Sequence, residues 1–171
     1  IDSATMMNKG LELIEAMWLY DMAPENIEIV IHRESIVHSA VEFDDGAVLA
    51  QLGLPDMRLP IQYALYYPER RYLPGDRLDF WKLSQITFEK PDLESFHGLA
   101  LAYEAGRRGG SLPTVFNAAN EYAVAKFLNR EISYLEITDM IQKAMEHHKV
   151  IDDPTVEQIL ETEREVDELL R

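Results

Sequence analysis

The chain has 171 residues, of which 31 are acidic and 16 are basic, giving a formal net charge of −15. A surface with this charge repels nucleic acid and anionic membranes, so the composition argues against either as a partner. The absence of cysteine excludes disulfides and thiolate metal sites, and it suits a reducing cytoplasm. We recognise no apolar run of membrane-spanning length and no signal peptide.

The first residues predict an amphipathic helix that runs from about Thr5 to Asp21 and ends before Pro24. At its start Ser3 or Thr5 can either cap the helix or donate a hydroxyl to a ligand. The expected buried stripe has helical spacing and consists of Met7, Leu11, Ile14 and Trp18.

Three polar residues of this helix, Asn8, Lys9 and Glu12, are spaced to share one of its sides. The free N–H groups and the dipole at a helix start favour an anion, and Lys9 adds a charge suited to phosphate. Glu12 either pairs with Lys9 or offers a carboxylate to a hard cation such as Mg²⁺. The spacing therefore leaves two interpretations open, an ordinary helix start with an ion pair or a phosphate and metal site.

A strand and a hairpin are predicted next. Residues 27–32 are apolar and β-branched, which favours a buried strand. Residues 36–43 and 47–52 alternate on either side of the turn residues 44–46, which is typical of a β-hairpin. One face of its first strand is expected to carry Val37, Val41 and Phe43, and the other His38, Ala40 and Glu42. A short helix is expected over residues 60–66.

The remaining chain predicts a linker followed by helices. Residues 67–91 contain prolines and glycine, and their aromatic side chains are expected to pack on a neighbouring domain. One helix is expected over residues 92–106, a second from Ser111, a third after a capping box at residues 133–136, and a fourth from residues 153–154. Short connections between four helices predict a small bundle. The expected buried side of the last helix consists of Val156, Ile159, Leu160, Val166 and Leu169.

Several ordered blocks resemble one enzyme family. They are IDSATMMNKGLE at residues 1–12, IHRESIVHS at 31–39, GAVLAQLG at 46–53, PDMR at 55–58 and NAANE at 117–121. Together they resemble 1-deoxy-D-xylulose 5-phosphate reductoisomerases of the non-mevalonate isoprenoid pathway. The resemblance covers only the C-terminal part of such an enzyme.

The resemblance implies an α+β fold, made of a remnant of a mixed or antiparallel-sheet catalytic domain, a linker and a C-terminal four-helix bundle. The implied domains are residues 1–66 for the catalytic and dimerisation part, 67–91 for the linker and 92–171 for the helical domain. The chain shows no glycine-rich nucleotide loop and does not begin with Met, so we expect a truncated or cleaved polypeptide that starts inside the catalytic domain.

The resemblance also implies site residues at the first helix. Ser3 and Asn8 would bind the substrate, and Lys9 would bind its phosphate end and act in catalysis. Glu12 would contact the substrate and hold the metal. The implied cofactors are NADPH, bound mainly by an N-terminal domain, and Mg²⁺ or Mn²⁺.

Two further residues carry weaker implications. His38 would be an acid–base group near the substrate, and the alternative is a structural strand histidine. Met57 would lie on a loop near the nicotinamide, and the alternative is a packing methionine. His147 and His148 are interpreted as capping the third C-terminal helix. The motif at residues 117–121 indicates close helix packing with buried amides, and no chemistry is assigned to Asn117, Asn120 or Glu121.

The implied activity is the NADPH- and metal-dependent conversion of a small phosphorylated sugar, 1-deoxy-D-xylulose 5-phosphate, to 2-C-methyl-D-erythritol 4-phosphate by a homodimer. We expect the 171-residue chain alone to be inactive, because one carboxylate is too few to hold Mg²⁺ against water. Two alternatives stay open. The chain is a dimerisation or interaction module, or it belongs to a related reductoisomerase-like enzyme with another phosphorylated substrate.

Overall fold

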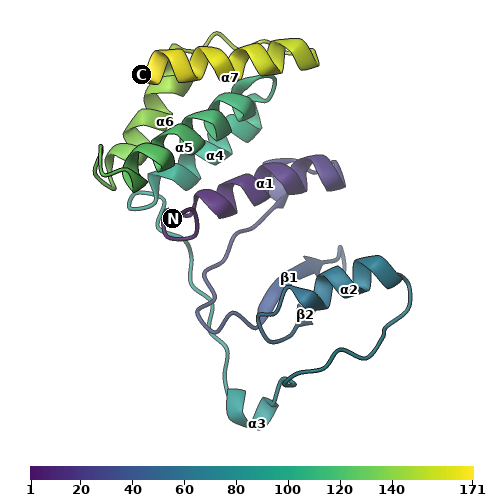
Figure 1. Cartoon of the computed structure of the whole chain (residues 1–171). Helices are drawn as coiled ribbons and strands as arrows, with labels where there is room; N and C mark the ends of the chain where they lie inside the picture. Colours follow the sequence, from purple (N-terminus) through teal and green to yellow (C-terminus); the bar gives the residue numbers. More distant parts are fainter. The chain divides into compact units, whose positions relative to one another are not determined.

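In the computed structural model all 171 residues are described, and they form two compact units (Figure 1). Unit 1 comprises residues 1–29 and 91–171, and unit 2 comprises residues 30–90. Seven α-helices and one two-stranded sheet make the fold α+β, as predicted. None of the helices combines the length and hydropathy that a membrane span requires.

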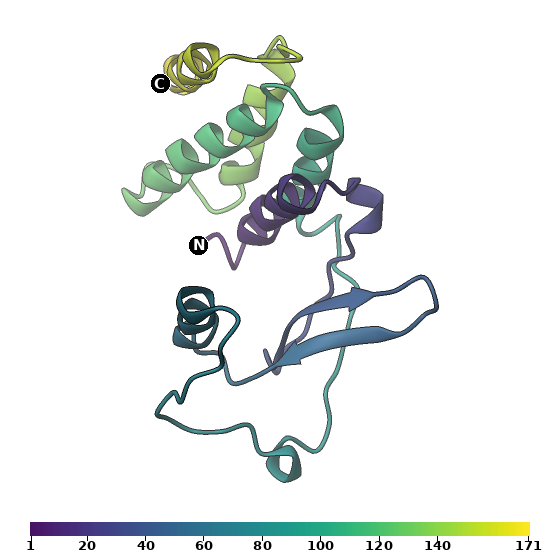
Figure 2. The same cartoon turned by 90° about the vertical axis from the view of Figure 1, so that its right-hand side faces the viewer.

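Unit 1 is helical. Its α-helices are α1 (Met7–Tyr20), α4 (His97–Arg108), α5 (Leu112–Leu128), α6 (Glu136–His147) and α7 (Val156–Leu170), with a short 3₁₀ helix η1 (Pro24–Asn26) after α1. Helix α5 packs against α4, α6 and α7, while α1 lies along α4 (Figure 2). The four predicted C-terminal helices are therefore all present.

Glycines let α1 and α4 approach closely. A Cβ atom added at Gly10 would lie 2.5 Å from the Cβ of Ala102, and one added at Gly98 would lie 2.7 Å from the Sδ of Met7. Neither position has room for a side chain, so a side chain of the facing helix packs directly against each glycine. This contact attaches the N-terminal helix to the C-terminal helices.

The compact units divide the chain differently from the predicted domains. Residues 1–29 pack with the C-terminal helices, and residues 67–90, expected to form a linker, belong to unit 2. The two ends of unit 2 are joined by an isolated antiparallel bridge between Ile31 and Glu89. Its two N–H···O bonds measure 2.8 and 2.9 Å. The assignment of catalytic, linker and helical domains within a longer protein stays a prediction.

The core of unit 1 corrects two predicted stripes. In α1 the predicted Met7 is buried and the predicted Leu11 and Ile14 pack partly buried against the core, but Gly10 and Leu13 are buried in addition and Trp18 is 77% exposed. The face toward α4 advances in steps of three residues, and it therefore turns away from Trp18 at the end of the helix. In α7 the buried residues are Thr162, Val166 and Leu170, while Val156, Leu160 and Leu169 are exposed. In α5 the buried residues include Val115, Phe116, Ala119 and Ala123, with Tyr122 and Phe127 partly buried against the same core.

Helix α4 begins later than predicted. The Asp92 carboxylate accepts bonds from the N–H groups of Glu94 and Ser95 and from the Ser95 hydroxyl, so it stabilises a turn that precedes the helix. The helix itself begins at His97 and ends at Arg108, where Gly109 with φ +64° follows. Asp92 makes the hydrogen bonds that are typical of an N-cap residue, but it makes them in a turn before the helix.

The predicted capping box at the start of α6 is only half formed. The carboxylate of Glu136 accepts a 2.7 Å bond from the N–H of Ser133, but no side chain caps the helix. A complete box occurs instead at α7, between Thr155 and Gln158. At α6 a turn at residues 134–135 precedes the helix and Leu135 occupies the N-cap, so Ser133 lies two residues too early to cap.

Unit 2 contains the predicted hairpin. Strands β1 (Val37–Glu42) and β2 (Val48–Leu52) pair antiparallel, followed by α2 (Arg58–Tyr66) and α3 (Phe80–Leu83). The register shifts between Val37 and Ser39, which inserts His38 as a bulge. Val37 therefore lies on the face of Ala40 rather than that of Val41, contrary to the predicted alternation.

The strand predicted at residues 27–32 is absent, and the aromatic residues of the predicted linker are exposed in this chain, so their packing on a neighbouring domain stays a prediction. The apolar run at residues 27–32 forms no strand and makes only the single bridge at Ile31, because no neighbouring strand extends along it. The aromatic side chains of residues 67–91 are exposed, and Trp81 reaches 94% exposure. Phe88 does find a partner and stacks on His32 at 4.8 Å between ring centroids.

Candidate functional site

A tight turn, residues 1–6, sets the direction of α1. The N–H groups of Ala4 and Thr5 both donate to the carbonyl of Ile1, at 2.8 and 3.0 Å, and the N–H of Asn8 donates to the carbonyl of Asp2 at 3.0 Å. The buried Thr5 hydroxyl lies 3.3 Å from the carbonyls of Ile1 and Asp2. We call this segment the N-terminal turn.

The predicted side-chain cap is not present. Met6 occupies the N-cap position of α1 with φ +60°, and no side chain caps the helix there. Backbone hydrogen bonds and the Thr5 hydroxyl hold the turn instead, so Ser3 does not cap α1. Ser3 is exposed, and its hydroxyl makes no hydrogen bond within the chain.

The three polar residues at the start of α1 do come together, as predicted. The Asn8 side-chain amide donates to one Glu12 oxygen at 2.6 Å, and Nζ of Lys9 lies 2.5 Å from the other. The Lys9 and Glu12 side chains are 42% and 47% exposed, so this ion pair contributes little to stability. The ion pair fits the first open interpretation, and the exposed, clustered groups beside a helix start fit the second.

The donor chemistry of Glu12 suits a hard divalent cation. Each carboxylate oxygen accepts one bond from a neighbour, which leaves further lone pairs free for a ligand. No group of three or more His, Cys, Asp or Glu side chains is placed to hold a metal ion. The chain therefore offers one carboxylate ligand, and a complete coordination shell needs ligands from elsewhere.

The other two predicted site residues belong to unit 2. His38 is exposed at the bulge of β1 and makes no side-chain hydrogen bond. Met57 is 72% exposed at the N-cap of α2, so it does not serve as a packing residue within this chain. The structure thus brings together Asn8, Lys9 and Glu12, with Ser3 in the adjoining turn.

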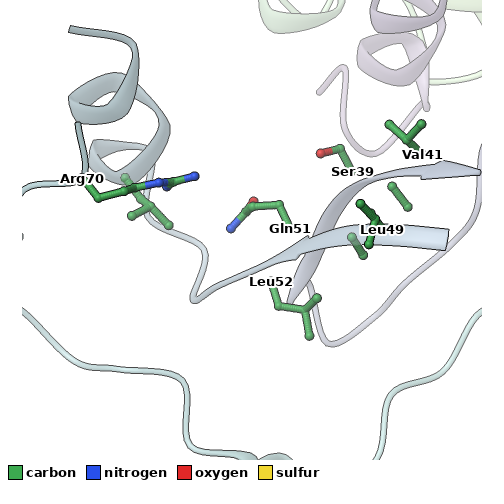
Figure 3. A pocket seen from close by; sticks show the side chains of 9 residues that line it. Ser39, Val41, Leu49, Gln51, Leu52 and Arg70 are labelled. Atoms are coloured by element: carbon green, nitrogen blue, oxygen red, sulfur yellow. The ribbon is translucent and has the colours of Figure 1, made fainter. Parts of the chain in front are cut away.

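Unit 2 also contains a pocket of about 630 Å³ that the sequence did not indicate (Figure 3). Ser39 and Gln51 line it from the hairpin, and Arg70 lines it from the segment after α2. Figure 3 shows the Arg70 guanidinium and the Gln51 amide extending toward each other. Arg70 also lies over the ring of Tyr63, 3.6 Å from its centroid. Residues so far apart in sequence give no local signal of this arrangement.

The two adjacent histidines at the end of α6 play different roles. Nδ1 of His147 lies 2.7 Å from a carbonyl one turn back, which agrees with capping. His148 instead places Nε2 2.7 Å from the hydroxyl of Ser111, which also accepts a 2.9 Å bond from the N–H of Ile151. Burial lowers the pKa of His148, against the opposing effect of the Glu165 carboxylate. His148 therefore links α6 to the start of α5.

Two residues of the helical bundle contact the N-terminal turn. Nδ2 of Asn120, in α5, lies 3.5 Å from a carboxylate oxygen of Asp2, and the hydroxyl of Tyr134 donates to the carbonyl of Ala4 at 2.9 Å. These partners are 118 and 130 residues apart, so no sequence spacing indicates either contact. The expected buried amide is found at Asn120 alone, since Asn117 bonds Glu121 on the helix surface.

Comparison with known proteins places these features in a family. Residues 52–169 match the DXP reductoisomerase C-terminal domain, and residues 1–20 match the 1-deoxy-D-xylulose 5-phosphate reductoisomerase C-terminal domain. The reductoisomerase of Lachnospira eligens is 61% identical over 170 residues, which are 99% of this chain and 45% of the relative. That of Lachnoclostridium phytofermentans is 65% identical over 166 residues, which are 96% of this chain and 43% of the relative.

Solved structures of reductoisomerases are also similar to this chain. The reductoisomerase from Zymomonas mobilis in complex with NADPH has a TM-score of 0.94 at 46% identity, covering 99% of this chain and 45% of that one. DOX-P reductoisomerase in complex with NADPH, fosmidomycin and magnesium has a TM-score of 0.93 at 42% identity, covering 99% and 44%.

The α+β fold and the matched domains define the class as reductoisomerases. The chain belongs to the 1-deoxy-D-xylulose 5-phosphate reductoisomerase family, as its sequence motifs predicted. It spans less than half the length of the curated relatives that it matches.

Proposed function

We propose that this chain forms the C-terminal part of an enzyme that converts 1-deoxy-D-xylulose 5-phosphate to 2-C-methyl-D-erythritol 4-phosphate with NADPH and Mg²⁺ or Mn²⁺. The observation that carries the proposal is the exposed cluster of Asn8, Lys9 and Glu12 at the start of α1. The names of the curated relatives support the reaction, and structures of relatives with NADPH and magnesium support the cofactors.

The first turn of α1 binds the substrate's phosphate in this proposal. The helix dipole adds a partial positive charge at this end of α1, although the N–H of Asn8 is already bonded to the Asp2 carbonyl. Lys9 supplies a full charge at the phosphate end, while the Asn8 amide and the Ser3 hydroxyl donate hydrogen bonds to the substrate. The surplus of negative charge over the chain makes this local positive charge necessary, because the phosphate approaches against the overall field.

Glu12 holds the divalent cation and faces the substrate's hydroxyl groups. When bound, the cation polarises the substrate's carbonyl and NADPH supplies the hydride. The bond from Asn8 and the ion pair with Lys9 fix the direction of the Glu12 carboxylate before any ligand arrives. A carboxylate that is already oriented loses less conformational entropy when it binds the cation, so the cation binds more tightly.

Unit 2 contributes His38 and Met57 to the proposed function. An exposed imidazole with no internal hydrogen bond is free to exchange a proton with a substrate hydroxyl. The exposed thioether of Met57 offers an adaptable apolar surface to a nicotinamide ring.

A chimera tests the reaction. Residues 1–171 replace the corresponding 170 residues of the Lachnospira eligens relative, and NADPH consumption is measured with 1-deoxy-D-xylulose 5-phosphate and saturating Mg²⁺. We expect a kcat/KM within about tenfold of the parent enzyme, and loss of activity on the sugar that lacks the phosphate. A folded chimera that leaves NADPH unconsumed, or one that prefers another sugar phosphate, contradicts the proposal.

The hairpin favours a second role in association. Nearly every residue of β1 and β2 is exposed, although a two-stranded sheet is marginal by itself. Its open edges are suited to pairing with another strand, so unit 2 is proposed to support a homodimer. Sedimentation of the chimera with Val41→Lys and Leu49→Lys tests this role. The paired charges are expected to shift the molecule to a monomer, and an unchanged mass argues against dimerisation at the hairpin.

A further inference from the structure

We propose that Asn120 and Tyr134 are positioning residues, which hold the N-terminal turn in its substrate-binding place from the helical bundle. The inference rests on the proposed function, because the turn carries Ser3 and leads into Asn8 and Lys9. It assigns the helical bundle a part in substrate binding, although neither residue is proposed to touch the substrate.

Tyr134 anchors the turn through one hydrogen bond. It lies between α5 and α6, where its ring packs edge-on against Phe127 at 6.3 Å between centroids. Its hydroxyl donates to the carbonyl of Ala4 at 2.9 Å, and no backbone N–H donates to that carbonyl. The ring contact fixes the tyrosine, and the hydroxyl then fixes the turn.

Asn120 anchors the turn at a second point. The side chain is only 2% exposed, and its amide nitrogen lies 3.5 Å from the Asp2 carboxylate. A carboxylate only accepts hydrogen bonds, so the nitrogen must face it and the amide oxygen points elsewhere. That oxygen is buried without a partner, an unfavourable state that an aliphatic residue at this position would avoid. The contact with Asp2 is the one hydrogen bond that this polar side chain makes.

The two anchors lie on either side of Ser3. Asp2 is held by α5 and Ala4 by Tyr134, so Ser3 is carried on a short segment fixed at both ends. The N–H of Asn8 also donates to the Asp2 carbonyl, which transmits this position to the first turn of α1. Displacements of about 1 Å in such groups change binding substantially. Loss of either anchor should therefore weaken substrate binding without removing any contacting group.

The first test uses a matched pair of tyrosine variants in the full-length chimera. Tyr134→Phe removes only the hydroxyl that reaches Ala4. Tyr103→Phe removes a hydroxyl that donates to another backbone carbonyl, that of Ile27 at 3.4 Å, away from the turn. We expect Tyr134→Phe to raise KM for the sugar phosphate about 2- to 10-fold with kcat nearly unchanged. The reason is that the displaced turn would bind the substrate and the transition state equally less well. Tyr103→Phe should leave KM within about twofold of the unsubstituted chimera.

The second test exchanges the members of the Asp2–Asn120 pair. Asn120→Asp places two carboxylates together, and their repulsion should raise KM about tenfold or more. The double variant Asp2→Asn with Asn120→Asp restores one amide and one carboxylate, so KM should return to within about threefold of the unsubstituted chimera. A merely structural role predicts no such rescue of KM.

The outcomes separate two failures. An unsubstituted chimera without activity overturns the proposed function and this inference with it. An active chimera in which Tyr134→Phe and Tyr103→Phe change KM equally overturns the positioning role alone. The positioning role is likewise overturned if the exchanged pair folds but keeps the high KM of Asn120→Asp.

Discussion

Nζ of Lys9 lies 2.5 Å from a carboxylate oxygen of Glu12, one helical turn further along α1. The other Glu12 oxygen accepts a bond from Asn8 at 2.6 Å, so the carboxylate is directed by two neighbours. All three side chains are substantially exposed, and such contacts stabilise a fold only slightly. Substitutions at this cluster should therefore separate function from stability.

Glu12→Gln should reduce the kcat/KM of the full-length chimera by about 100-fold or more at saturating Mg²⁺, because the amide is a poor ligand for a hard cation. The free energy of unfolding should change by less than about 1 kcal/mol, as expected for an exposed pair. Steady-state kinetics and urea unfolding measure the two quantities.

Glu15→Gln is the matched control for this substitution. Glu15 lies beyond the Asn8–Glu12 turn on the same helix, is exposed, and makes no side-chain hydrogen bond. It should retain activity within about twofold, because Glu15 makes no hydrogen bond or ion pair with Asn8, Lys9 or Glu12, and removing such a surface charge is nearly neutral. Equal losses in Glu12→Gln and Glu15→Gln would reject a specific role as metal ligand.

The 171-residue chain alone should not consume NADPH in the presence of 1-deoxy-D-xylulose 5-phosphate and Mg²⁺. It offers a single carboxylate to the cation, and no cluster of three metal-ligating side chains occurs in it. An absorbance assay at 340 nm on purified material, with the active chimera as positive control, measures the activity. Turnover by the isolated chain would show that its own residues suffice.

Gly10→Ala should destabilise unit 1 by about 1–3 kcal/mol, because the new methyl group meets Ala102 of α4. A separation of 2.5 Å between the two Cβ atoms is too short for both side chains to keep their places. Denaturant unfolding followed by circular dichroism measures the loss. The double variant with Ala102→Gly moves the methyl from one helix to the other, so it should recover most of the stability.

The stability of unit 1 should depend on pH through His148. Burial lowers the pKa of its imidazole below the ordinary value near 6.5, so the unfolded chain binds a proton more readily than the folded chain. This contribution is fully present above about pH 6.5 and is lost as the pH falls toward the folded-state pKa. His148→Gln cannot titrate, so its unfolding free energy should decline less between pH 7.5 and 5.5. Parallel declines in the two proteins would contradict the assignment.

Local signals in the sequence predicted the elements that depend on neighbouring residues. The hairpin follows from alternating strands around a turn in which Gly46 adopts φ +81°. Helix α5 begins as predicted, directly after Ser111. The i, i+3 and i+4 spacing also placed Asn8, Lys9 and Glu12 together, because helix geometry alone sets those distances.

Features that depend on distant partners were not predictable in this way. The exposure of Trp18 follows from which face of α1 meets α4, and the bulge at His38 follows from the pairing of β1 with β2. The contacts of Asn120 and Tyr134 with the N-terminal turn join residues at opposite ends of the chain. Only the packed fold brings them together, so no local pattern signals them.

The most direct measurement is an anomalous-scattering crystal structure of the full-length chimera with Mn²⁺ and fosmidomycin. We expect a manganese peak within about 2.5 Å of a Glu12 oxygen, with the phosphonate held at the start of α1 by Asn8 and Lys9. A manganese peak away from Glu12, or a phosphonate bound at another place in the molecule, would contradict it.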